Sequence, residues 1–330
     1  MMTAKGFKIA AAVLAVLLLA AGCIAPNVRL FPSAHEPLKE RVLSGSARGK
    51  VLVLSIKGPI TDASDEGLLR VKPSPVEELA AQLNLARRDP DVKAVVLIVN
   101  SPGGTAMASD IIYHELMDFK EKTGVKLVVA MMDIAASGGY YVSLPADWIV
   151  AHPATVTGSV GVIMVRADVS GLMEKLGLKI TAQTSGRNKD MGSPFRPPTG
   201  EEVKLFQDVA DSMAARFIGL VKERRKLSPE AALEVSTARI FTAQRALELG
   251  LVDEIGYMDA AIKKAETLAG LPDDARIVAY RRTGYPDDTV YNTTTMDAGG
   301  KPALVNLSIP ALAPANLSPG FYYLWLPGGP

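Results

Sequence analysis

Continuous apolar runs alternate with stretches of helical periodicity through the middle of the chain. The runs are rich in β-branched residues, which is typical of strands, and the longest read as strands buried on both faces of a sheet. The predicted strands are residues 51–56, 92–99, 127–131, 148–151 and 276–280. The other stretches carry apolar residues at the spacing of a helix with one buried face. The predicted helices are residues 75–88, 111–122, 137–144, 201–226, 243–249 and 258–271. This alternation predicts an α/β fold with a largely parallel sheet.

The start of the chain has the pattern of a secretory signal. Lys5 and Lys8 precede an apolar run at residues 9–21, and small residues lead into Cys23. The run is short for a transmembrane helix, which needs about 20 apolar residues. The segment L-A-A-G-C resembles a bacterial lipobox, although Ala20 stands where leucine is usual. We therefore expect lipidation at Cys23, with a cleaved signal peptide or a short uncleaved anchor as alternatives.

These features divide the chain into four parts. Residues 1–22 are the expected signal peptide, and residues 23–49 a polar tether. Residues 50–280 hold the folded domain, and residues 281–330 form a Pro- and Gly-rich tail with an aromatic end. This organisation predicts a protein of the bacterial cell envelope, attached to a membrane by its N-terminus, with its domain outside the cytoplasm. Which membrane carries it stays open.

Composition excludes several classes of function. The net charge of +1 and the lack of a basic stripe argue against nucleic-acid binding. A single cysteine excludes an internal disulfide framework. The segment H-E-L-M-D at residues 114–118 resembles a zinc-protease helix, but Asp118 stands where the second histidine would be. We therefore predict neither a metal site nor a cofactor.

The segment A-A-S-G-G-Y-Y contains the candidate nucleophile. Ser137 follows a predicted buried strand and begins a predicted helix, the position where open α/β sheets bind ligands. A serine hydroxyl needs a nearby base, and adjacent glycines let backbone N–H groups approach a developing oxyanion. The segment N-S-P-G-G at residues 100–104 ends another predicted strand and offers the same kind of turn. An ordinary tight turn or helix packing would be the simpler interpretation of each segment alone.

Lys189 is the candidate general base. It lies 52 positions after Ser137, in the polar segment S-G-R-N-K-D-M-G-S-P. Lysine acts as a base only as the neutral amine, which burial favours. A histidine base has little support, because no serine lies in a G-x-S-x-G segment. Most lysines are simply solvated, so this assignment depends on the other segments.

Taken together, these segments resemble bacterial signal peptide peptidase A in its short, single-repeat form. The resemblance covers residues 50–280 and includes N-S-P-G-G, A-S-G-G-Y-Y, T-G-S-V-G-V, the N-K-D-M-G-S-P segment and F-T-A-Q-R-A-L-E-L-G-L-V-D-E-I-G. It implies the Clp protease and crotonase fold, a repeated ββα superhelix. The lipobox-like start departs from the simple membrane anchor of many members.

The resemblance also implies roles for particular residues. Ser137 would be the nucleophile, Lys189 the base and Ser159 a residue that orients the lysine. Backbone N–H groups of Gly104 and Gly138 would form the oxyanion hole. The expected activity is that of a serine endopeptidase with a Ser–Lys dyad. Its expected partners are cleaved signal peptides and other apolar peptides, a membrane, and further copies of the chain in a ring, without nucleic acid.

Three other interpretations stay open from the sequence. A related membrane-bound Ser–Lys protease with a specific protein substrate would share the same core segments. A crotonase-type acyl-CoA enzyme would share the fold and the oxyanion loops, but would not require Ser137 or Lys189. A non-catalytic scaffold lipoprotein would not react with serine-directed probes.

Overall fold

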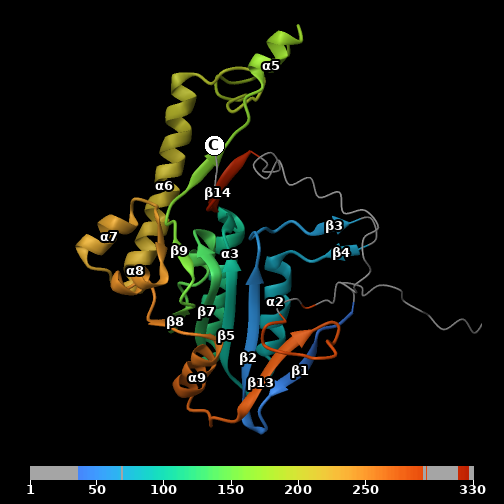
Figure 1. The fold of residues 1–330 in the computed structure, drawn as a ribbon. Helices are drawn as coiled ribbons and strands as arrows, with labels where there is room; N and C mark the ends of the chain where they lie inside the picture. The colour runs from blue at the N-terminus through green and yellow to red at the C-terminus, as the bar shows by residue number, and fades with distance from the viewer. Residues whose placement is uncertain (1–35, 68–69, 293–294, 296–318, 327–330) are drawn as a thin grey trace, which may run out of the picture.

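The computed structural model describes residues 36–67, 70–292, 295 and 319–326 (Figure 1). The expected signal peptide and the lipidation site at Cys23 lie outside these residues. In the described part, no helix is both long enough and apolar enough to cross a membrane.

A nine-stranded, mostly parallel sheet forms the centre of the molecule. Along its main path the strand order is β1-β13-β2-β5-β7-β8-β12, and β9 pairs with both β7 and β11. Within this sheet, as far as the structure describes it, only the β1–β13 and β9–β11 pairs are antiparallel. The strands are β1 (Lys39–Ser44), β2 (Ala47–Lys57), β5 (Val92–Ser101), β7 (Lys126–Ala136), β8 (Trp148–Ala151), β9 (Val156–Gly158), β11 (Ile240–Thr242), β12 (Glu254–Ile255) and β13 (Ala275–Arg281). The predicted α/β class with a largely parallel sheet is therefore confirmed.

Helices bury both faces of this sheet, which explains why its central strands are apolar throughout (Figure 1). Alternate residues of β2 face opposite sides of the sheet and belong to two separate hydrophobic cores. Leu52 and Leu54 pack with α2 and α3 in one core, and Val51 and Val53 pack with α9 in the other. The helices are α2 (Pro75–Ala86), α3 (Ala106–Thr123), α4 (Gly138–Tyr141), α5 (Ser170–Lys175), α6 (Gly200–Arg225), α7 (Pro229–Val235), α8 (Ala243–Glu248) and α9 (Met258–Ala269).

Two small sheets lie outside the main one. The first has the order β10-β14-β6, with β6 (Gly103–Thr105), β10 (Ile163–Val165) and β14 (Gly320–Leu324). The second is the antiparallel pair β3 (Asp65–Gly67) and β4 (Arg70–Lys72). In Figure 1, β14 lies near α3, α6 and β9, at the end of the central sheet opposite β1.

Paired strands extend past both expected limits of the folded domain. β1 lies within the expected tether at residues 23–49, and it forms the edge of the main sheet beside β13. β14 lies within the expected tail at residues 281–330, and it pairs with strands of the domain. The ordered fold therefore includes parts of both segments, so residues 50 and 280 do not mark its ends.

Candidate active site

Ser137 lies at the junction between β7 and α4 in a strained conformation. Its φ and ψ are 53° and −114°, a region that non-glycine residues rarely adopt. Such a conformation costs about 1–3 kcal/mol and persists only where the surroundings enforce it. The backbone N–H of Ser137 donates to the Gly158 carbonyl at 2.8 Å, which fixes the turn to the neighbouring strand β9. Strain at one polar residue after a buried strand is typical of a functional position.

Ser159 lies beside Ser137 because β7 and β9 are parallel neighbours. The register pairs Ala136 with Gly158, so the two serines each follow the last paired residue of adjacent strands. Ser159 also has a positive φ, 52°, and its N–H donates to the Arg239 carbonyl at 2.8 Å. The structure therefore brings these two predicted site residues to the same edge of the sheet.

The N-S-P-G-G segment reaches this edge through β6. Gly103 has a φ of 98°, and a Cβ on it would lie 2.6 Å from the Gly138 nitrogen, so only glycine fits there. The same residue's N–H donates to the buried Ser101 hydroxyl at 3.1 Å. Next to it, Gly104 forms a β-bridge with Ile60, and a Cβ on Gly104 would clash with the Ile60 backbone.

These contacts bring the two predicted oxyanion residues, Gly104 and Gly138, into one small region beside Ser137. Backbone amides held this rigidly can stabilise a developing negative charge without reorganising. α4 has only four residues, so its dipole adds little, and the N–H groups themselves are the relevant donors.

Lys189 lies apart from this cluster within one chain. Its side chain is exposed, and among the described residues no hydrogen bond or ion pair joins its amine to Ser137 or Ser159. The segment between α5 and α6 that carries it extends beyond β14, at the far end of the long helix α6 (Figure 1). A single chain therefore places four of the five predicted catalytic residues together and leaves the lysine outside.

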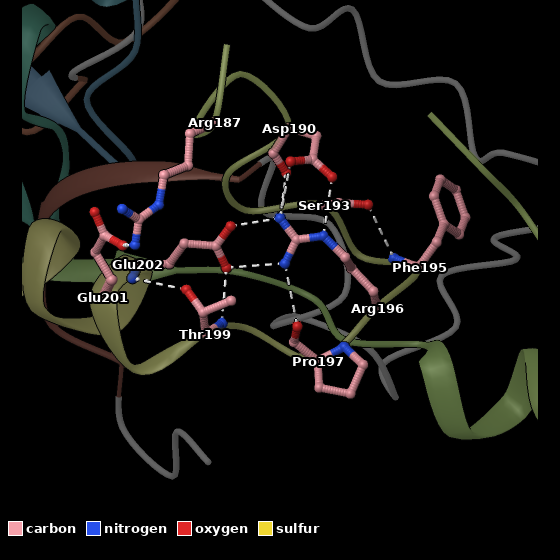
Figure 2. Close-up of polar contacts among 9 residues, drawn as sticks. All are labelled: Arg187, Asp190, Ser193, Phe195, Arg196, Pro197, Thr199, Glu201 and Glu202. Carbon is pink, nitrogen blue, oxygen red and sulfur yellow. Dashed lines mark hydrogen bonds and ion pairs between the residues drawn. The ribbon is translucent and has the colours of Figure 1, made fainter. Parts of the chain in front are cut away.

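An ionic network holds the Lys189 segment against the start of α6 (Figure 2). Arg196 contacts both carboxylate oxygens of Asp190 at 2.9 Å and donates to Glu202 at 3.0 Å. Glu202 is buried and also accepts from the Thr199 N–H at 2.9 Å, within the box of side-chain bonds that begins α6. The hydrogen bonds from Arg196 lower the pKa of both carboxyl groups below their ordinary values. The residue next to Lys189 is therefore anchored, although the lysine itself points into solvent.

Two features that could suggest other chemistry, a histidine after β8 and the H-E-L-M-D segment, have structural roles. His152 Nδ1 accepts from the Ala154 N–H at 3.1 Å, in a turn after β8. Asp118, the last residue of the H-E-L-M-D segment, forms ion pairs with Arg87 and Lys122. Within the described residues, no group of three or more histidine, cysteine or acidic side chains could hold a metal ion.

Comparison with known proteins places this arrangement in a family. Residues 119–272 match the model of Peptidase family S49. The chain is 35% identical over 269 residues to a protein of Enterococcus faecium named "Putative signal peptide peptidase SppA", covering 80% of this chain and 77% of that protein. The chain belongs to peptidase family S49. It is a serine peptidase of the signal peptide peptidase type, as the sequence predicts.

Two solved structures resemble the fold at low sequence identity. One is a mutant of the 1510-N membrane-bound stomatin-specific protease, with a TM-score of 0.43, 17% identity, and coverage of 72% of this chain and 96% of that one. The other is a mutant of ClpP1 from Listeria monocytogenes, with a TM-score of 0.41, 18% identity, and coverage of 63% and 94%.

Sequence reasoning did not single out Gly103 or the strand β14. The segment N-S-P-G-G predicts only a turn at Gly103, because the packing of Gly103 against Gly138 depends on a contact between two loops that are 35 residues apart. The aromatic end of the chain has no local feature that indicates which strands it pairs with.

Proposed function

We propose that this chain is a membrane-attached serine endopeptidase that degrades cleaved signal peptides and other apolar peptides. The observation that carries the assignment is the strained Ser137 at the end of β7, next to the close backbone contact between Gly103 and Gly138. Membership of family S49 supports peptide hydrolysis over acyl-CoA chemistry. Loss of hydrolysis of a quenched apolar peptide in Ser137→Ala, with the fold intact, tests the assignment. Acyl-CoA binding at low ligand concentration, without peptidase activity, would overturn it.

The reaction has two steps. In the first, the Ser137 hydroxyl oxygen attacks the peptide carbonyl carbon, the Lys189 amine takes the hydroxyl proton, and the N–H groups of Gly104 and Gly138 bind the oxyanion. The Lys189 ammonium then protonates the leaving amine as the peptide bond breaks, which leaves an acyl ester on Ser137. In the second step, Lys189 deprotonates a water molecule that attacks this ester, and the returned proton restores the Ser137 hydroxyl.

We further propose that each active site takes Ser137 and Lys189 from different copies of the chain. Lys189 lies apart from the serine in one chain, on a segment held away from the sheet. The neighbouring stretch exposes large apolar side chains, which is typical of a surface that another protein covers. These exposed residues are Leu172, Leu176, Leu178 and Ile180. A head-to-tail ring would bring such a segment to the serine of the next copy.

Complementation between two inactive variants tests the shared site. Ser137→Ala and Lys189→Ala chains are purified separately, then dissociated, mixed in equal amounts and reassembled. If neighbours share a site, about a quarter of the interfaces join an intact serine to an intact lysine, so activity returns to about that fraction of wild type. Each variant reassembled alone is the control. Inactive mixtures whose mixed composition is verified by native mass spectrometry would contradict the shared site.

The attachment to the membrane is a separate proposal, resting on the lipobox-like segment at Cys23. Wild-type protein expressed with a clickable palmitate analogue should be labelled, and Cys23→Ser should not be. Cys23 is the chain's single cysteine, so other acylated thiols cannot confuse the result. A single acyl chain gives only marginal anchoring, so multiple acylation is expected in the intact mass. Equal labelling of both proteins would contradict lipidation at this residue.

A further inference from the structure

The segment that carries Lys189 is shaped by local turns. The Lys189 N–H donates to the Gly186 carbonyl at 3.0 Å, and the Met191 N–H donates to the Asn188 carbonyl at 3.2 Å. Bonds of such short range set the shape of the segment but not its place on the domain. A catalytic base has to be held within about 0.5 Å of its working position, so contacts of longer range must fix that place.

Arg196 connects the residue next to Lys189 to the first turn of α6 (Figure 2). Its Nε and Nη2 donate to the two carboxylate oxygens of Asp190, both at 2.9 Å, and Nη2 also donates to the Asp190 carbonyl at 3.3 Å. On the other side of the guanidinium group, Nη1 donates to Glu202 Oε2 at 3.0 Å, and Nη2 contacts Glu202 Oε1. The guanidinium fork is rigid and planar, so paired contacts on each side fix direction as well as distance.

Glu202 is the fixed end of this connection. It is only 3% exposed, and it accepts from the Thr199 N–H at 2.9 Å, while its own N–H donates to the Thr199 hydroxyl oxygen at 3.2 Å. These reciprocal bonds form a capping box, which locks the Glu202 side chain at the start of α6. Arg196 therefore ties Asp190 to a carboxylate that is itself held in place.

The helix α6 connects this fixed end to the body of the domain. Phe217 and Val221 of the helix are fully buried, in the same core as α2 and α3. At the last residue of the helix, Arg225 donates to both carboxylate oxygens of Asp253, at 3.0 and 2.7 Å. A helix of 26 residues is a rod about 39 Å long, so anchoring one end in the core determines where Glu202 lies at the other.

We propose that Arg196 is a positioning residue for peptide hydrolysis: by clamping Asp190 to Glu202, it holds Lys189 at the place from which its amine reaches the nucleophile. This inference rests on the proposed peptidase function and adds a residue to its machinery. Arg196 acts through Lys189 and takes no proton itself, because a guanidinium group stays charged in a protein. Its loss should therefore slow the chemical steps without weakening the binding of the peptide.

Replacement of Arg196 tests the clamp. Arg196→Ala should lower kcat for a quenched apolar peptide by about 100-fold, because a displacement of about 1 Å at the reacting groups costs about that factor. KM should stay within about twofold of wild type. Arg196→Lys keeps the charge but replaces the fork by a single ammonium group, so the loss should be smaller, about 10-fold. Native mass spectrometry and thermal unfolding show whether each variant assembles and folds.

Arg187→Ala is the matched control. It removes the same charge from the same segment, two residues before Lys189, and Arg187 also contacts a glutamate in the first turn of α6, Glu201. Both side chains of that pair are exposed, and an exposed ion pair contributes little. Arg187→Ala should therefore match wild type in kcat and KM. Equal losses of kcat in Arg187→Ala and Arg196→Ala would show that the charge of the segment matters and that the clamp does not.

Two further measurements separate positioning from a purely structural role. Guanidinium ions at low millimolar concentration should restore part of kcat in Arg196→Ala, because the free ion can bridge the same two carboxylates, and should restore nothing in Lys189→Ala. Asp190→Asn should lower kcat by itself but add little to the loss in Arg196→Ala, because both changes break one bridge. Additive losses in the double variant would overturn the proposed clamp.

The outcomes distinguish this inference from the proposed function. If the wild type cleaves peptides and Arg196→Ala has the same kcat, Arg196 is not a positioning residue, and the peptidase assignment stands. If no form cleaves peptides or reacts with a fluorophosphonate, the proposed function fails. If Arg196→Ala does not fold or assemble, Arg196→Lys and Asp190→Asn decide. A lower kcat at unchanged KM and melting temperature supports the inference, whereas a parallel fall in kcat and melting temperature shows that the network is structural only.

Discussion

Replacing Ser137 with alanine is expected to lower kcat for peptide hydrolysis by about 10⁴-fold or more, because the variant has no nucleophile. The fold should be retained. Alanine keeps the Cβ at this strained position, and the backbone N–H can still donate to Gly158. Steady-state hydrolysis of a quenched peptide measures the loss, and a fluorophosphonate probe followed by peptide mapping identifies the reactive residue.

Ser143→Ala is the matched control for this variant. Ser143 is buried in the same region of the chain, and its hydroxyl donates to the Gly139 carbonyl at 2.8 Å. Its replacement should reduce the free energy of unfolding by about 1 kcal/mol and leave the acylated residue unchanged. Probe labelling of a serine other than Ser137 would show that the nucleophile is wrongly assigned.

Replacing Lys189 with arginine should be as damaging as replacing it with methionine, each lowering kcat by about 10³-fold. Arginine preserves the positive charge but cannot give up a proton in a protein, so it cannot act as a base. Ser159→Ala should lose less, about 10-fold, because a hydroxyl that orients the amine takes no proton itself. Parallel measurements of kcat on the assembled protein distinguish these variants.

Lys179→Arg provides the control for the lysine series. Lys179 is an exposed lysine on the same segment between β10 and α6, and its replacement should leave turnover at the wild-type level. Near-normal turnover in Lys189→Arg would show that position 189 supplies charge only, and another group would then have to be the base.

Local sequence predicts the central layers of this fold but not its margins. The buried strands of the sheet are continuous apolar runs, so composition alone identifies them. β1 has the sequence K-E-R-V-L-S and is largely exposed, because it lies at the sheet edge, and no apolar run marks it. β14 is aromatic, as strands often are, but its partners lie more than 150 residues away in the sequence. Pairing over such distances depends on tertiary structure and has no local signal.

For the site, too, the sequence indicates which residues take part but does not specify how they are placed. The segments that end two predicted strands indicate Ser137 as the candidate nucleophile, and the family resemblance implies Gly104 and Gly138 as the oxyanion donors. Their contact follows from β-strand register and from the positive φ of Gly103, neither of which the sequence specifies directly. The chemistry of lysine and the resemblance of its segment to a family motif indicate Lys189 as the base, but a single chain does not place it beside the serine.

The position of β13 constrains the order in which the molecule can be completed during synthesis. Residues 275–281 insert between β1 and β2, pairing antiparallel with the first and parallel with the second. A nascent chain that has not yet reached this segment leaves the apolar strand β2 with one open edge, a template for aggregation. Until residues 275–281 have been made, β1 has no strand partner in the main sheet and β2 pairs only with β5. Pairing across such a long separation is slow. During synthesis, this edge of β2 stays exposed until β13, the last strand of the main sheet along the sequence, has emerged.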